Sequence, residues 1–149
     1  MYTNARLAEQ LSILGTIDPV SQAAGTITTG WLSAANHERF MALLQTGVLG
    51  ASATVDAKLQ QATDNAGTGA KDVTGKAIVQ IVKATGDNKQ ALINLRAEEL
   101  DLANNFTFFR LSITVGVAAS LVGASVLGGV PKNLPASALN QAGVAQNIS

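Results

Sequence analysis

The stretch Ala53-Thr54-Val55-Asp56-Ala57-Lys58-Leu59-Gln60 alternates apolar and polar side chains without a break over eight residues. Successive side chains of a β-strand point to opposite faces, so this pattern predicts a strand with one buried and one solvated face. A helix would instead repeat its apolar residues every three or four positions. The stretch therefore indicates that the protein is built from β-strands.

Further strand signals lie on both sides of this stretch. Upstream, residues 25–32 are rich in β-branched and aromatic side chains, and residues 40–49 form an apolar run. Downstream, apolar residues return over 72–82, and residues 90–97 alternate again; helical turns compete only over 96–104. Seven or eight short strands, separated by turn signals at spacings of about a dozen residues, predict an all-β fold. We expect an antiparallel β-sandwich of the jelly-roll type.

The twenty residues from Leu111 to Val130 contain no charged side chain and are long enough to span a bilayer as a helix. Their composition nevertheless favours two strands. Apolar residues at 109, 111, 113 and 115 alternate with polar ones, and the segment 116–120 offers a turn before a second strand ends at two glycines. We therefore expect a β-hairpin, with a transmembrane helix as the alternative.

The two ends of the chain differ from its middle. Residues 1–24 contain a short candidate helix over 4–13 and then Ile17-Asp18-Pro19, which favours extended chain; they lack the basic and apolar pattern of a signal peptide. Residues 131–149 carry few charges and show no alternation. The expected organisation is an N-terminal arm (1–24), a β-sandwich domain (25–130) and an extended C-terminal arm (131–149). We expect a neighbouring subunit to hold the arms in place.

Composition excludes several kinds of chemistry. The 149 residues include ten Lys and Arg against ten Asp and Glu, so the net charge is zero. Nucleic-acid affinity comes mostly from clustered cations, and we expect no nucleic-acid partner. The chain has no cysteine and one histidine, which removes disulfides, thiolate metal sites and multi-histidine sites. No cofactor and no catalytic activity are expected.

Two polar segments resemble ligand-binding motifs but lack their essential features. The segment from Gly67 to Lys76 places Ala70 where a phosphate-binding loop needs glycine and Ala77 where it needs a hydroxyl, so a plain flexible loop is expected. The carboxylates of Glu98, Glu99 and Asp101 lack the spacing of a calcium loop. A solvated acidic loop paired with Arg96 or Arg110 is the simpler interpretation.

Two single residues allow a functional and a structural interpretation. His37 could in principle join Ser33 in a nucleophilic arrangement, but no nucleophile motif surrounds it, and an exposed loop histidine is expected. Trp31, the lone tryptophan, could stack on a sugar. Carbohydrate sites usually display several aromatic side chains, whereas this chain has six in all, so core or interface packing is expected for Trp31.

Several segments together resemble small structural proteins of tailed bacteriophages and prophages. They are TTGW (28–31), GASATVDAKLQQATD (50–64), KDVTGKAI (71–78), INLRAEELD (93–101) and RLSITVG (110–116), and the likeness runs from about residue 17 to residue 131. It lies in strand and turn pattern and includes no catalytic signature. The resemblance implies a virion protein, and β-rich phage head proteins of this size are commonly capsid decoration (cement) proteins.

This resemblance implies a place and partners for the chain. The protein would be made in the bacterial host cytoplasm and bind the major capsid protein on the phage head surface, as a trimer or similar oligomer and away from membranes. We expect contacts to involve these residues: Trp31, Arg96, Pro131, Leu134, Pro135 and Ile148. The alternatives are a neck, tail or baseplate component, a carbohydrate-binding β-sandwich module, and a membrane-active phage protein.

Overall fold

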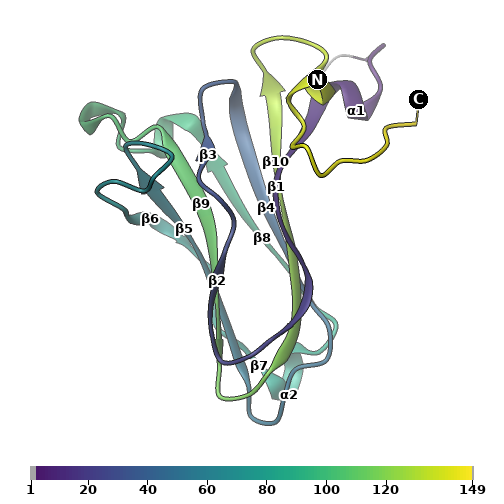
Figure 1. The fold of residues 1–149 in the computed structure, drawn as a ribbon, viewed down its shortest axis with the longest axis vertical. Coiled ribbons are helices and arrows are strands. Elements are labelled where there is room, and N and C mark those ends of the chain that lie inside the picture. Colours follow the sequence, from purple (N-terminus) through teal and green to yellow (C-terminus); the bar gives the residue numbers. More distant parts are fainter. Residues whose placement is uncertain (1–2, 149) are drawn as a thin grey trace.

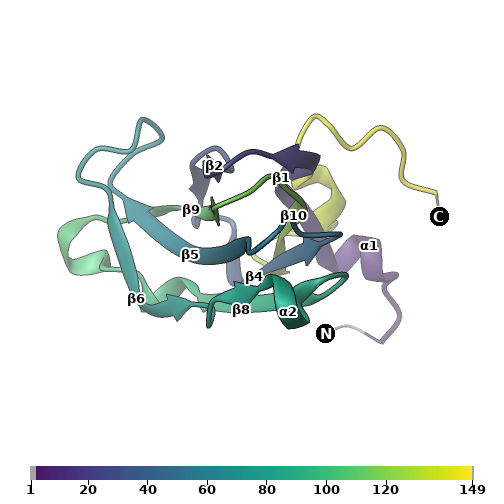
Figure 2. The same cartoon turned by 90° about the horizontal axis from the view of Figure 1, so that it is seen from below.

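Two antiparallel β-sheets packed face to face form the body of the computed structural model, which describes residues 3–148 (Figures 1 and 2). Sheet A has the strand order β1-β10-β4-β8, and sheet B has the order β2-β9-β5-β6, with β3 paired to β9 and β7 to β5. The strands are β1 (Leu11–Gln22), β2 (Gly25–Thr28), β3 (Leu32–Ser33), β4 (His37–Thr46), β5 (Thr54–Ala62), β6 (Lys71–Ala77), β7 (Ile81–Val82), β8 (Gln90–Arg96), β9 (Phe108–Gly116) and β10 (Ser120–Pro131).

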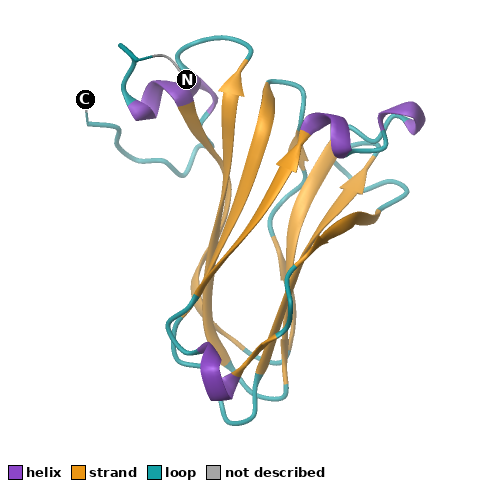
Figure 3. Cartoon of the chain, turned by 180° about the vertical axis from the view of Figure 1, so that it is seen from behind, coloured by secondary structure: helices purple, strands orange, loops and turns teal. Residues whose placement is uncertain are grey.

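Short helices lie at the two ends of the sandwich (Figure 3). The α-helices are α1 (Leu7–Gln10) and α2 (Lys83–Gly86), and the 3-10 helices are η1 (Ala97–Glu99), η2 (Leu102–Asn104) and η3 (Ala136–Leu139). Helices α1 and η3 contact each other at one end, and α2 lies at the opposite end beside β7. None of these helices separates the two sheets, so the core is formed by strands.

The pairing of the strands is that of a jelly roll. When the short strands β3 and β7 are set aside, β1 pairs with β10, β2 with β9, β4 with β8, and β5 with β6. Each strand of the first half thus pairs with its mirror position in the second half, and successive pairs alternate between the two sheets. The all-β jelly-roll sandwich predicted from the sequence is confirmed.

The strand over residues 53–60 is central to sheet B and buries the face that its alternation predicts. Its inward side chains oppose those of β9 in register, with Val55 opposite Val115 and Leu59 opposite Leu111, all at most 1% exposed. On the outer face, Lys58 Nζ donates to Asp72 Oδ2 on β6 at 2.8 Å. The sequence pattern and the register therefore agree along this strand.

Two phenylalanines join the sheets across the core. Phe109 on β9 belongs to sheet B and Phe40 on β4 to sheet A, and their ring centroids lie 4.7 Å apart at 58°. Both rings are buried, Phe109 completely. This contact is a direct aromatic link between the two layers.

The uncharged run over residues 111–130 forms most of β9 and β10, so the two predicted strands are confirmed, but the predicted β-hairpin is wrong. The two strands lie in different sheets, so they do not pair with each other. No helix in the described part of the chain is long and apolar enough to cross a membrane. The transmembrane-helix alternative for this run is wrong.

The predicted N-terminal arm is wrong over most of its length. Residues 11–22 form β1, which pairs with β10, and the helix expected over 4–13 is restricted to α1. Register shifts between Ile13 and Gly15 and between Ile17 and Val20 interrupt the strand. Such bulges break the period of two, which explains why the sequence pattern does not reveal this strand. The sandwich therefore extends over 11–131 rather than 25–130.

The expected loop and strand between residues 67 and 82 are also divided differently. Strand β6 begins at Lys71, inside the segment expected to be a loop, and residues 78–80 separate it from β7. Both strands pair with β5.

Candidate interaction surface

The outer face of sheet A carries apolar side chains in two adjacent rows across the strands. In the first row, Ile13, Leu127 and Met41 are neighbours in register on β1, β10 and β4. In the second row, Leu43 on β4 faces Leu92 on β8. All five are at least partly exposed, and Leu92 is 55% exposed. An exposed apolar surface of this kind is typical of an interaction site.

A groove of about 540 Å³ lies at one end of this face. Its apolar part includes Met41 and Leu127 from the first row. Gly129, which has no side chain, also lines the groove. Gln10, Arg39 and Asn94 provide polar groups. Its lining residues are Gln10, Leu11, Arg39, Phe40, Met41, Asn94, Leu127, Gly129, Val130 and Pro131. A largely apolar hollow with a few polar groups is the usual form of a binding site.

Two arginines lie side by side next to this groove. Arg39 on β4 is directly opposite Arg96 on β8, a like-charge pairing that is unfavourable across antiparallel strands. Glu98 is the carboxylate that contacts both, with Oε1 3.2 Å from Arg96 Nη1 and Oε2 3.9 Å from Arg39 Nη1. We call Arg39 and Arg96 the arginine pair. The two arginines together carry one more positive charge than Glu98 can neutralise.

The C-terminal segment 136–141, which we call the C-terminal latch, covers the free edge of β1 at Ile13. Ile13 N donates to Asn140 Oδ1 at 2.8 Å, and Gln141 N donates to Ile13 O at the same distance. Ala136 is fully buried. The expectation of a wholly extended C-terminal arm held by a neighbouring subunit is therefore wrong for this segment, because β1 of the same chain holds it. Both backbone hydrogen-bonding groups of Ile13 are therefore occupied and not available to another strand.

His37 is a buried residue rather than the exposed loop histidine expected from the sequence. It begins β4, is 1% exposed, and lies 2.9 Å through Nε2 from Ser12 Oγ. Ser12 Oγ in turn donates to the carbonyl of Ala136 at 2.5 Å, so His37 Nε2–H is the donor toward Ser12. The serine proton is thus committed to a backbone carbonyl of the latch. This arrangement is a structural connection and not an activated nucleophile.

The stability of the protein should depend on pH through His37. Burial lowers the pKa of His37 below 6.5, and Nδ1 has no hydrogen-bond partner among the described residues. The unfolded chain therefore takes up the proton first, and stability falls as pH drops below about 6.5 toward the folded pKa, with a slope of at most about 1.4 kcal/mol per pH unit.

Urea unfolding of the wild type and of His37→Gln between pH 5.5 and 7.5 measures this slope. The substitution should abolish it, because the chain has no other histidine. An unchanged slope in the variant would contradict this role of His37. Asp and Glu side chains with lowered pKa values, such as Asp87 bonded by Lys83 and Leu49 N, act only at lower pH.

Trp31 packs on sheet B, away from the groove. The guanidinium of Arg110 lies 4.4 Å from its ring centroid, so a cation occupies one ring face. Gly67 approaches the indole closely: a Cβ there would lie 2.5 Å from Nε1, and its φ of +86° also favours glycine. The packing interpretation of Trp31 thus fits a half-buried side chain tied to two neighbouring segments.

The acidic loop is tied to lysines of β6 as well as to Arg96. Glu99 Oε2 lies 2.9 Å from Lys76 Nζ, and Asp101 pairs with Lys71, whose Nζ also lies 4.1 Å from the Phe106 ring centroid. Hydrogen bonds from Arg96 N and Lys76 lower the pKa of Glu99. Within residues 3–148, no group of three or more His, Asp and Glu side chains is arranged to hold a metal ion.

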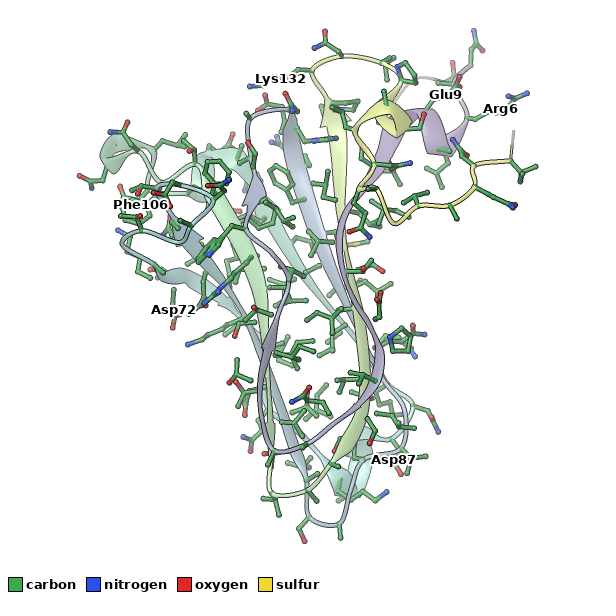
Figure 4. All side chains as sticks on the ribbon, viewed as in Figure 1. Arg6, Glu9, Asp72, Asp87, Phe106 and Lys132 are labelled. Atoms are coloured by element: carbon green, nitrogen blue, oxygen red, sulfur yellow. The ribbon has the colours of Figure 1, made fainter. Side chains whose placement is uncertain are left out.

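The six expected contact residues do not form one site. Pro131 lines the groove, Arg96 lies beside it, and Trp31 is on the other sheet. Leu134 and Pro135 are exposed just before the latch, and Ile148 is 87% exposed beyond it. In Figure 4, the labelled side chains Lys132, Glu9 and Arg6 mark the end of the sandwich where α1 and the latch lie.

Sequence reasoning missed the residues that form most of the groove. Met41 and Leu127 belong to stretches interpreted as uniformly apolar, yet both alternate with buried neighbours such as Phe40 and Val126. Following the period of two through residues 37–46 would have marked Arg39, Met41 and Leu43 as outward-facing.

Comparisons with known proteins identify no family for this chain. No family model matches this chain, and no curated protein matches it. Among solved structures, it is similar to a chain of Cowpea mosaic virus top component, with 11% identity, a TM-score of 0.44 and 88% of each chain covered. It is also similar to a chain of Triatoma Virus, with 9% identity and a TM-score of 0.47 over 95% of this chain and 74% of that one.

A third similar structure has a different function. The CBM22-2 xylan-binding domain from Paenibacillus barcinonensis shares 10% identity and a TM-score of 0.45 over 85% of this chain and 91% of that one. Sequence identities and TM-scores this low do not distinguish a virion role from a carbohydrate-binding role.

Proposed function

We propose that this chain is a virion structural protein that decorates the head of a tailed bacteriophage by binding the major capsid protein. The observation that carries the proposal is the apolar outer face of sheet A with its groove, a surface built for contact with another macromolecule. The resemblance of residues 17–131 to structural proteins of tailed phages supplies the class of partner.

The chemistry of the chain supports a binding role in preference to a reaction. Its one histidine is buried and bonded to Ser12, whose own proton is given to Ala136 O. The acidic side chains near β6 are engaged by lysines. A decoration protein needs shape, apolar contact and correct assembly, and it needs no reactive group, metal or cofactor.

Oligomer formation is part of the proposed role. A capsid presents the same site many times in a symmetric array, so a closed symmetric oligomer, most simply a trimer, would match it. A net charge of zero also reduces the repulsion between copies. The proposed place of the protein is the outer surface of the phage head.

Co-sedimentation with capsids tests the proposal. Purified full-length protein is mixed with heads and, separately, with tails of the phage or prophage that encodes it, and the bound copies are counted. We expect saturable binding to heads, in a fixed ratio to the major capsid protein, and a trimer by light scattering. Binding to tails or necks alone would overturn the decoration role in favour of a neck, tail or baseplate component. Binding to neither would overturn the virion role.

A further inference from the structure

The arginine pair gives the groove a chemical preference. Arg39 and Arg96 face each other in register on the exposed surface, with side chains 50% and 57% exposed. Placing two like charges together on a sheet is unfavourable unless an anion joins them. Within the described residues, Glu98 is the carboxylate that contacts both, and one of its two distances is 3.9 Å. A second carboxylate would neutralise the remaining charge.

Among the residues that the structure describes, Glu38 and Glu99 do not supply that second anion. Glu38, the neighbour of Arg39 in β4, offers it only its backbone carbonyl, at 3.0 Å from Arg39 Nη1. The Glu38 side chain lies 3.9 Å from Lys132 Nζ. Glu99 is bonded to Arg96 N and Lys76. The unbalanced charge therefore lies beside the apolar groove, where a bound partner would meet both.

The extent of the apolar surface points to a polypeptide partner. Beyond the groove, the outer face continues to Leu43 and Leu92, so a small molecule in the groove would leave this second row uncovered. We propose that the groove binds a polypeptide segment of the partner protein that places apolar side chains over Met41 and Leu127 and a carboxylate on the arginine pair. This inference rests on the proposed function and specifies the partner segment that it requires.

Methionine methyl NMR on the full-length protein tests the groove directly. The chain has two methionines, Met1 and Met41, so the Met41 signal reports on the groove. The probes are two synthetic peptides, acetyl-Ser-Leu-Val-Ile-Glu-Ser-amide and the same peptide with Lys in place of Glu. We expect the Met41 methyl to shift saturably with the Glu peptide and about 2- to 5-fold weaker binding of the Lys peptide, the effect of one partly exposed ion pair.

Three variants make the test specific. Arg39→Glu combined with Arg96→Glu should reverse the preference for the two peptides. Gly129→Leu should abolish binding of both, because it fills the groove from a position whose Cβ would already lie 3.2 Å from Leu11 Cδ2. Val79→Ser, at an exposed apolar residue between β6 and β7 of sheet B and away from this face, should leave both affinities unchanged.

Several results would overturn the inference. They are the absence of a Met41 shift at millimolar peptide, equal affinity for both peptides, and tighter binding of decanoate than of either peptide, which would indicate an amphiphile site. Capsid co-sedimentation separates this inference from the proposed function. Capsid binding without peptide binding would remove only the groove assignment, and peptide binding without capsid binding would remove only the decoration role.

Discussion

Phe109→Ala is expected to lower the free energy of unfolding by about 3–5 kcal/mol, the range for removing a fully buried aromatic ring. Phe109 has no exposed surface, and its ring contacts Phe40 across the two sheets. The substitution leaves a cavity that the surrounding strands can fill only in part, because each is held by its sheet hydrogen bonds. Urea unfolding monitored by circular dichroism measures the loss.

The preceding residue provides a matched control. Phe108 has the same side chain on the same strand but is only partly buried. Phe108→Ala should cost less than half as much, since truncating a partly solvated ring removes less apolar surface from the core. Equal losses for the two variants would show that the sheets are not joined through Phe109 in the way the structure indicates.

The parts of the fold that sequence predicts well are those with regular alternation and a buried partner. Val55, Ala57 and Leu59 follow a strict period of two and face Val115, Ile113 and Leu111 in register. Their pattern therefore reports their environment directly. Strand β8 behaves in the same way, with Ile93 and Leu95 buried between exposed residues.

The parts that sequence predicts poorly depend on irregularity or on distant partners. Strand β1 carries two register shifts, so Leu7, Leu11 and Leu14 resemble a helical face although Leu11 and Leu14 belong to a strand. His37 follows a polar segment, and its buried hydrogen bond is with Ser12, 25 residues away, which in turn bonds to Ala136, 124 residues from Ser12. Nothing near His37 in the sequence indicates these contacts.

The candidate surface could be predicted only in fragments for the same reason. Arg96 and Pro131 were expected contact residues, but their relation to Arg39, Met41 and Gly129 depends on the strand order β10-β4-β8. That order joins residues more than fifty positions apart. The alternation of side chains along one strand shows which of them point outward. The order of strands in the sheet then decides which outward side chains become neighbours.

Removing the C-terminal latch is expected to destabilise the protein by about 2–5 kcal/mol, through several hydrogen bonds of about 1 kcal/mol each and the loss of a buried alanine. A chain ending at Pro131 loses Ala136 and the bonds of Asn140 and Gln141 to Ile13. It also uncovers the edge of β1, so association that grows with protein concentration should accompany the loss. Urea unfolding and light scattering measure the two effects.

A chain ending at Gln141 separates the latch from the residues beyond it. This variant keeps the bonds to β1, and its free energy of unfolding should stay within about 0.5 kcal/mol of the full chain. Its binding to capsids should nevertheless weaken, because Ile148 and residues 145–147 are exposed and can contact the major capsid protein. Undiminished capsid binding would exclude residues 142–149 from the contact. Undiminished stability of the chain ending at Pro131 would show that the latch does not hold β1, and the edge of sheet A would then be open to a partner strand.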